Sequence, residues 1–528
     1  MFSYNLLNES WIPTRNLSNE IICRGIEDTL KNAHQIKDIS DPAPTIQYSL
    51  YRFLIAFIMD VYGFGNPTND LEELEELIQF GQFDSDLIDA YIEKWSNRFD
   101  LFHEKYPFMQ VPLPVGKKEK SISNLMVHMP TGNNVIHFHH LYEDENAYTP
   151  AVCARALITI SNFAVGGLAG PGVPNFTSGI NGSPPVYVLI RGMNLFETLV
   201  YNICRFSDFP LTGSEPPAWS SEKIPKPEEI NVYSLLEGLT WRARAVTLIP
   251  EEKNSICTYS GEHSRILVSN MFMTPGFNAR GDWFDPYVPY AYNKKGPYPI
   301  HLSENKDIWR EIGPLMFLQK ENYSGEDGKR YDRPLIVTQF KKLIDNDFID
   351  QAVRLTLEVY GVLSDQAKIL DWNYSLLSLP NDFVFYDQYG EVIQKSIDFS
   401  EKVSKQLQYS IKRAYPPRGK NSKEPATELI SRAQKTFWQD CKLEFDNFLQ
   451  IDRNDTVRFL EAVNLWKQIT AEIGERVLNS VLDSLDSNAE SIRRSVAARD
   501  YYKTQIYFML NPEKSKKVKK GERNEQRI

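Results

Sequence analysis

The chain has 528 residues, more than one compact core usually holds, so two or more domains are expected. Its composition, 42% hydrophobic and 24% charged, is typical of a globular protein and excludes a disordered or fibrous one. The net charge of −10 argues against a free-standing DNA-binding protein, because such proteins usually carry a basic excess.

The first 375 residues show a mixed and irregular pattern. Clusters of glycine and proline at 166–175 and 293–299 interrupt short apolar runs, which predicts long loops between small elements. We expect helices at 45–62 and 71–80 and strands at 186–190 and 245–249. The fold class predicted for residues 1–375 is therefore an irregular α+β domain.

After residue 375 the pattern becomes helical. Four long segments of helical periodicity with short connections predict a four-helix bundle over 376–512. These segments are 391–414, 425–450, 455–485 and 488–511. In the third, Asp455 is the expected N-cap, and the face expected to be buried comprises Val457, Leu460, Val463, Leu465, Trp466, Ile469, Ile473, Val477, Val481 and Leu485. Residues 513–528 are expected to form a basic flexible tail.

Charge is distributed unevenly along the chain. Residues 401–528 carry 25 basic and 18 acidic residues, net +7, whereas the remainder carries 34 and 51, net −17. The C-terminal part is therefore the better candidate for contact with a polyanion, although a helical domain with a basic tail has the same pattern.

No sign of secretion or membrane insertion is found in the sequence. The opening MFSYNLLNESWIPT lacks the features of a signal peptide, and no apolar run reaches about 18 residues. The five cysteines form no CxxC pair, which argues against a disulfide framework and a four-cysteine zinc site. We predict a cytoplasmic protein.

Searches for catalytic motifs give one candidate. The chain has no GxxxxGK[ST], GxGxxG or GxSxG motif. His137 and His139, followed by acidic residues 143–145, have a spacing compatible with a metal-dependent nuclease. No HD pair or HExxH motif accompanies them, so a polar loop that contains histidines is the favoured interpretation, and no metal, cofactor or catalytic residue is predicted.

Six blocks in order resemble one family, the CasA large subunit of the type I-E CRISPR Cascade complex. The resemblance spans about residues 5–510, and the C-terminal bundle agrees with it. The blocks are NLLNESWIPT (5–14), YPFMQ (106–110), SGINGSPPVYVLIRGMNLFETLVYN (178–202), PPAW (216–219), LLEGLTWRARAVTL (235–248) and YGVLSDQAKILDW (360–372).

The resemblance implies a non-catalytic protein at one end of a crRNA-guided complex. Such a subunit recognises the protospacer-adjacent motif (PAM) in double-stranded DNA, helps to unwind the target and recruits a separate helicase–nuclease. Its implied partners are target DNA, the crRNA-containing backbone and small subunits, and that nuclease. Base pairing reads the long target sequence, and protein reads only the short motif. The alternatives are the metal-dependent nuclease and a scaffold subunit without DNA contact.

The resemblance assigns the strand wedge to SDQAKIL (364–370). The family places a glutamine there on a loop or hairpin just past the PAM, which makes Gln366 the candidate, with Asp365 and Ala367 beside it. Inserting a side chain into a base step costs a few kcal/mol of unstacking, which other contacts must offset. Without the resemblance, an exposed turn is the favoured interpretation of this segment.

Two further segments correspond to PAM-contacting elements of the family. A glycine-rich loop corresponds to 170–175, with Gly170, Gly172 and Asn175 as candidates; it departs from the family by carrying Val173 and Pro174 where adjacent glycines are expected. In MFMTPGFNARGDW (271–283), Gly276 stands where some members have a lysine, and we expect Asn278 or Arg280 to substitute.

Further family features fall elsewhere in the chain. Phe138 matches an aromatic residue on a loop, about 130–148, that contacts the guide end and the PAM region. Some members have two CxxC pairs that bind zinc. Here only Cys153 and Cys257 remain, and two thiolates cannot complete a tetrahedral site, so no zinc is predicted.

Basic residues of the bundle are candidates for contact with DNA phosphate or with neighbouring subunits. A solvated helix face is the alternative interpretation. The candidates on the last helix are Arg493, Arg494, Arg499 and Lys503.

Overall fold

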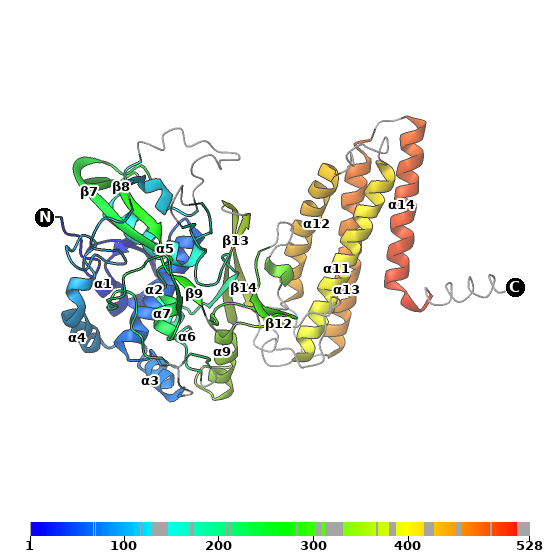
Figure 1. Cartoon of the computed structure of the whole chain (residues 1–528). Helices are drawn as coiled ribbons and strands as arrows, with labels where there is room; N and C mark the ends of the chain where they lie inside the picture. Colours follow the sequence, from blue (N-terminus) through cyan, green and yellow to red (C-terminus); the bar gives the residue numbers. More distant parts are fainter. Residues whose placement is uncertain are drawn as a thin grey trace. The chain divides into compact units, whose positions relative to one another are not determined.

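The structure is a computed structural model. It describes residues 2–66, 68, 70–116, 118–128, 146–168, 174–206, 209–211, 213–280, 283–302, 308–311, 331–365, 368–379, 387–416, 427–449, 456–485 and 488–514. Two compact units are present, residues 1–381 and 382–528 (Figure 1). The division lies a few residues beyond the 375 expected from sequence, because strand β14 (Lys368–Leu379) continues across that position.

Two apolar helices form the centre of the N-terminal unit. α2 (Pro44–Val61) buries residues on all its faces, and α5 (Pro150–Phe163) is buried along its whole length. The two helices pack against each other. An apolar pattern on every face is typical of a helix surrounded by protein. α5 begins at Thr149, whose hydroxyl accepts a hydrogen bond from the Val152 N–H.

Small sheets surround these helices, as expected for an irregular α+β unit. Their pairing is antiparallel except for β6 and β9, which pair in parallel. The strand orders are β2-β1-β3, β11-β10-β12, β14-β13-β5, β4-β8-β7 and β6-β9.

The strands of this unit vary widely in length. Their bounds are β1 Ile12–Asn16, β2 Ile21–Arg24, β3 Ile36–Ile39, β4 Lys120–Ser121, β5 Tyr187–Ile190, β6 Glu229–Asn231, β7 Arg244–Ile256, β8 His263–Pro275, β9 Asn278–Arg280, β10 Tyr290–Asn293, β11 Gly296–Pro299, β12 Tyr331–Asp332 and β13 Leu355–Asp365. β7 is much longer than the expected 245–249, because its second half is exposed and polar and so lacks the apolar signal of a buried strand.

Shorter helices complete the N-terminal unit. They are α1 (Ile26–Lys31), α3 (Glu72–Phe80), α4 (Ser85–Trp95), α6 (Leu195–Tyr201), α7 (Leu235–Leu239) and α9 (Leu335–Asp345). One-turn 3-10 helices lie at Ala33–Gln35, Ser96–Arg98, Ile122–Leu125 and Ile308–Glu311. α2 and α3 confirm the helices expected at 45–62 and 71–80.

A buried ion pair lies in the core. Arg52 of α2 contacts Asp285 at 2.9 Å, and both side chains are at most 1% exposed. Arg52 also donates to the hydroxyl of Tyr48 and to the carbonyl of Leu239. Because removing one partner would leave an uncompensated buried charge, the pair ties α2 to distant segments of this unit.

The C-terminal unit is the expected four-helix bundle. Its helices are α11 (Asp387–Ala414), α12 (Thr427–Phe448), α13 (Thr456–Leu482) and α14 (Ala489–Leu510). Trp466 of α13 is buried, and its indole N–H donates to the Ser396 carbonyl of α11. No helix among the described residues has both the length and the apolar character needed to cross a membrane.

The buried face of α13 agrees with the prediction only in part. Val457, Leu460 and Leu465 are exposed, Val457 by 65%. The buried residues are Phe459, Ala462, Trp466, Thr470, Ile473, Val477, Leu478 and Leu482, of which Trp466, Ile473 and Val477 were expected. These also recur at three-to-four spacing, so periodicity alone did not distinguish two overlapping apolar faces. The expected N-cap, Asp455, lies outside the described residues.

Candidate nucleic-acid interface

The segment assigned to the strand wedge joins two long strands. β13 and β14 pair from Leu355 and Leu379 to Asp365 and Lys368, with a register shift after Leu363. β5 pairs only with residues 357–360 of β13, so the rest of the hairpin is a two-stranded ribbon. The backbone of Asp365 is the end of β13, whereas Gln366 and Ala367 lie outside the described residues.

A buried carboxylate anchors the base of this hairpin. Glu358 of β13 is fully buried and pairs with Arg191, which also pairs with Asp38. The Tyr360 hydroxyl donates a further hydrogen bond to Glu358. Burial and the neighbouring carboxylate raise the pKa of Tyr360, so its hydroxyl stays protonated and able to donate. These contacts join the hairpin to the sheet that contains β3.

The ends of the glycine-rich loop are held together as a short stem. Gly167 and Phe176 exchange backbone hydrogen bonds of 3.0 and 2.8 Å, and the Gly179 N–H donates to the Ala164 carbonyl. Asn175 is exposed beside this stem. Gly170 and Gly172 lie outside the described residues. The loop therefore starts and finishes at a defined position on the N-terminal unit.

Arg244 clamps this stem. Its Nη1 donates to the carbonyls of Thr177 (2.7 Å) and Ala243 (2.8 Å), and its Nη2 donates to that of Val165 (2.9 Å). The side chain is buried and forms no ion pair with any carboxylate among the described residues. Burial lowers the pKa of Arg244 to about 10, so the guanidinium remains charged at neutral pH.

A second cation lies on the same aromatic ring. Lys120 Nζ and Arg244 Cζ are 4.5 and 4.6 Å from the ring centroid of Phe176. Burial and the nearby Arg244 charge lower the pKa of Lys120. Neither cation forms an ion pair with a carboxylate among the described residues, so the stem carries a local positive potential.

The segment 276–280, which is expected to replace the missing lysine, is held by the backbone of residues 242 and 243, next to Arg244. The N–H groups of Gly276 and Phe277 donate to the carbonyls of Ala243 and Arg242. A Cβ atom at Gly276 would lie 2.5 Å from the Arg242 carbonyl oxygen, so no side chain fits there without moving the backbone. A lysine at this position is therefore sterically excluded in this chain.

The two proposed substitutes for that lysine lie on β9. Asn278 is half-buried and its amide lies 3.5 Å from the carboxylate of Glu229 on β6, whereas Arg280 is exposed. The Arg280 carbonyl accepts a hydrogen bond from the Val232 N–H. Arg280 is therefore the more accessible of the two side chains.

Hydrogen bonds link the hairpin and the loop stem to one scaffold. Tyr187 of β5, which pairs with β13, donates to the Asn162 carbonyl at 3.0 Å. Asn162 lies in the last turn of α5, two residues before the stem residue Ala164. The β13–β14 hairpin, the stem and the 276–280 segment thus belong to one connected framework of the N-terminal unit.

Several sequence candidates lie outside the described residues. These are Phe138 and the histidines of the alternative metal site, His137 and His139. His128, just before that segment, lies 3.2 Å from the Tyr259 hydroxyl through its Nε2. Burial lowers the pKa of His128 to about 4, so the imidazole is neutral at pH 7.

The two cysteines that remain from the zinc motif are buried. Burial raises the pKa of the Cys153 thiol, and the neighbouring Cys257 raises it further. The Ser260 N–H donates to the Cys257 sulfur at 3.4 Å. In the part of the chain that the structure describes, no three His, Cys, Asp or Glu side chains are grouped to hold a metal ion.

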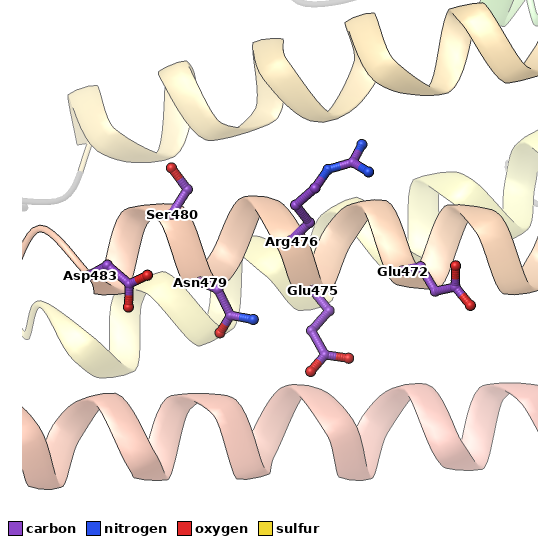
Figure 2. A pocket seen from close by; sticks show the side chains of 6 residues that line it. All are labelled: Glu472, Glu475, Arg476, Asn479, Ser480 and Asp483. Atoms are coloured by element: carbon purple, nitrogen blue, oxygen red, sulfur yellow. The ribbon is translucent and has the colours of Figure 1, made fainter.

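Most basic candidates of the bundle pair with carboxylates of the same unit. Arg499 donates to Asn479 (2.8 Å) and Asp483 (2.9 Å), and Lys503 lies 3.1 Å from Glu475. Figure 2 shows Glu475 and Asn479 directed toward one neighbouring helix and Arg476 and Ser480 toward another. An open groove of about 660 Å³ runs along Glu472, Glu475, Arg476, Asn479, Ser480 and Asp483.

The remaining two candidates differ in their contacts. Arg494 lies 3.5 Å from Glu490, whereas Arg493 is exposed and has no ion pair with a described residue. Pairs at a protein surface contribute only about 0–1 kcal/mol, so a phosphate can compete for these cations. Contact of the four basic residues with DNA or subunits stays a prediction, and Arg493 is the most available of them.

Comparisons with known proteins give consistent matches. The model of the family described as CRISPR-associated protein Cse1 matches residues 5–477. A CRISPR-associated protein CasA/Cse1 from Thermus thermophilus is 26% identical over 419 residues, covering 77% of this chain and 76% of that protein. The crystal structure of Cse1 from Acidimicrobium ferrooxidans matches with a TM-score of 0.75 at 20% identity, over 97% of this chain and 99% of that one. A chain of a CRISPR RNA-guided surveillance complex matches with a TM-score of 0.73 at 20% identity, over 95% and 99%.

Proposed function

Since this chain belongs to the CRISPR-associated Cse1 family, we propose that it is the non-catalytic large subunit of a crRNA-guided surveillance complex. The likeness to a chain of such a complex over nearly its whole length supports this assignment. In the complex, the subunit recognises the PAM in double-stranded DNA, helps to open the target and recruits a separate helicase–nuclease.

The observation that carries the DNA-reading role is the shared anchor at residues 242–244. Arg244 binds both sides of the loop stem, and the backbone of 242–243 holds the segment that leads to Arg280. Two segments about 100 residues apart in the chain are thereby held on one short stretch of backbone. Such a shared anchor suits a protein that recognises about three base pairs, because a small displacement of either segment would misplace its contacts with the DNA.

The wedge role rests on the hairpin. Its strands are paired up to Asp365 and Lys368, and its base is fixed by the buried Glu358–Arg191 pair. A side chain inserted into a base step must resist the few kcal/mol of stacking that favours closure, and an anchored ribbon provides that resistance. Gln366, at the end of this ribbon in the sequence, is the wedge residue of the proposal.

The experiment is a gel shift with purified guide-loaded complex, with and without this chain. Targets share one protospacer and differ in the three flanking base pairs. We expect tight duplex binding to require the chain and to depend on the flank. Gln366→Ala should weaken duplex binding at least about tenfold, corresponding to about 1.4 kcal/mol, and should spare a target that is already unpaired beside the flank.

Gln79→Ala is the matched control, because it removes a glutamine from the exposed face of α3. Duplex binding that is unchanged without this chain would refute the DNA-reading role and favour a scaffold subunit.

A further inference from the structure

A cavity of about 310 Å³ lies where three of the sequence blocks meet. It is lined by Arg98, residues 105–112, Ala218 and Trp219, residues 221–225 and Arg242. Residues 106–110 form the YPFMQ block, Ala218 and Trp219 belong to the PPAW block, and Arg242 belongs to LLEGLTWRARAVTL. The proposed DNA-reading role involves none of the side chains that line this cavity, so it does not explain why three blocks meet there.

The cavity has an excess of positive charge. Arg98, Lys105, Lys223 and Arg242 line it together with the carboxylate of Glu222, and Glu237 of the adjoining chamber pairs with Lys223 at 2.6 Å, which leaves four cations against two carboxylates. Arg98 and Glu222 are 3.8 Å apart, a loose contact. Lys105 forms no ion pair with any described residue. Burial lowers the pKa of Arg242 to about 10, which leaves it charged at neutral pH, and its Nη2 donates to the Lys223 carbonyl. A partner with negatively charged groups would compensate the excess positive charge of the cavity.

A smaller chamber adds an unused hydrogen-bond donor. About 20 Å³ in volume, it shares Ala218, Lys223 and Arg242 with the main cavity. Trp241 lines this chamber and is 2% exposed, and its indole N–H has no acceptor among the described residues. Buried indole N–H groups usually find a partner, and this space admits one water or one ligand oxygen.

The surroundings favour a peptide over a nucleic acid. Base recognition by stacking needs an open aromatic face. Here the ring of Tyr106 is covered by Arg98 at 3.6 Å, and Trp219 is buried with its N–H donated to Tyr91. The open surface at the rim is aliphatic instead, since Ile224 is 60% exposed. Apolar and cationic groups together match a peptide that carries apolar and acidic side chains.

We propose that this cavity binds an extended acidic segment of a partner protein. An apolar side chain of that segment covers Ile224, and its carboxylates face Lys105 and Arg242. The inference rests on the proposed function only in requiring that the chain assembles with other protein subunits.

The first test measures assembly without DNA. The complex lacking this chain is immobilised, and binding of the purified chain is followed by interferometry. The double variant Lys105→Glu/Arg242→Met is expected to bind at least about tenfold more weakly, because it reverses one charge and removes another. Lys253→Glu, a charge reversal at an exposed position of β7, is the matched control and should bind within about twofold of the parent.

The second test locates the occupant and does not depend on the fold of the double variant. A photoreactive p-benzoyl-phenylalanine replaces Ile224 in the reconstituted complex, and cross-linked peptides are mapped by mass spectrometry. A cross-link to an acidic stretch of a protein subunit supports the proposal. A cross-link to guide RNA, to the target strand or to a second copy of this chain overturns it, as does the lack of any cross-link. If the chain docks through this cavity but the complex does not discriminate between flanking base pairs, the DNA-reading role is refuted and the docking proposal stands.

Discussion

Arg244→Met is the substitution that tests the proposed reading site most directly. Methionine keeps an unbranched side chain of similar length but donates no hydrogen bond. Three carbonyl oxygens, those of Val165, Thr177 and Ala243, lose a charged donor. At about 1 kcal/mol for each buried acceptor, the free energy of unfolding should fall by about 3 kcal/mol, within the 5–15 kcal/mol that folded domains usually have.

The variant should therefore fold and join the complex, yet hold its loop stem loosely. Hydrogen exchange should accelerate at the amides of Gly167 and Phe176, which pair across the stem. In the gel shift, discrimination between flanking base pairs should fall at least about tenfold, while pairing of the guide with an already open target should not change.

Leu343→Ala is the control for lost stability. Leu343 is fully buried in α9, and its truncation should cost about 2–5 kcal/mol without affecting the stem. The reasoning is refuted if Arg244→Met keeps the flank dependence of the parent, or if Leu343→Ala loses it to the same extent.

The remaining predictions concern separate parts of the molecule. Glu358→Gln should lower the free energy of unfolding by about 3 kcal/mol, because Arg191 loses a buried partner, and denaturant unfolding checks this. The folded-state pKa of His128, about 4, lies below the usual 6.5, so protonation favours the unfolded chain. The contribution of His128 to the free energy of unfolding should be fully present above pH 6.5 and should decline by up to about 3 kcal/mol toward pH 4. His128→Phe should remove that part of the decline, as measured by denaturant unfolding at a series of pH values. Arg493→Ala should reduce the slope of log binding constant against log salt by about one if this residue contacts a phosphate, and an unchanged slope would remove it from the interface. Metal analysis of the purified chain should give far less than one equivalent of zinc, whereas stoichiometric zinc would show that Cys153 and Cys257 have further ligands.

Much of the architecture follows from local patterns in the sequence. Apolar residues at three-to-four spacing over twenty or more residues predict helices whatever their neighbours are, so the four helices of the bundle were found within a few residues of their ends. The long apolar run at 45–62 likewise predicts α2. The family resemblance was also local, because it depends on blocks of contiguous residues such as 235–248.

The tertiary structure decided which residues act together. Val165, Thr177 and Arg244 are far apart in the chain, and only the packing of β7 against the loop stem makes one guanidinium the donor to both sides. The same holds for the cavity beside Arg242, which three separate blocks enclose. Exposure is equally non-local: Val457 and Trp466 both fit a helical apolar pattern, but only Trp466 faces another helix. Sequence periodicity is set by the geometry of one element, whereas burial and hydrogen-bond partners are set by the elements packed around it.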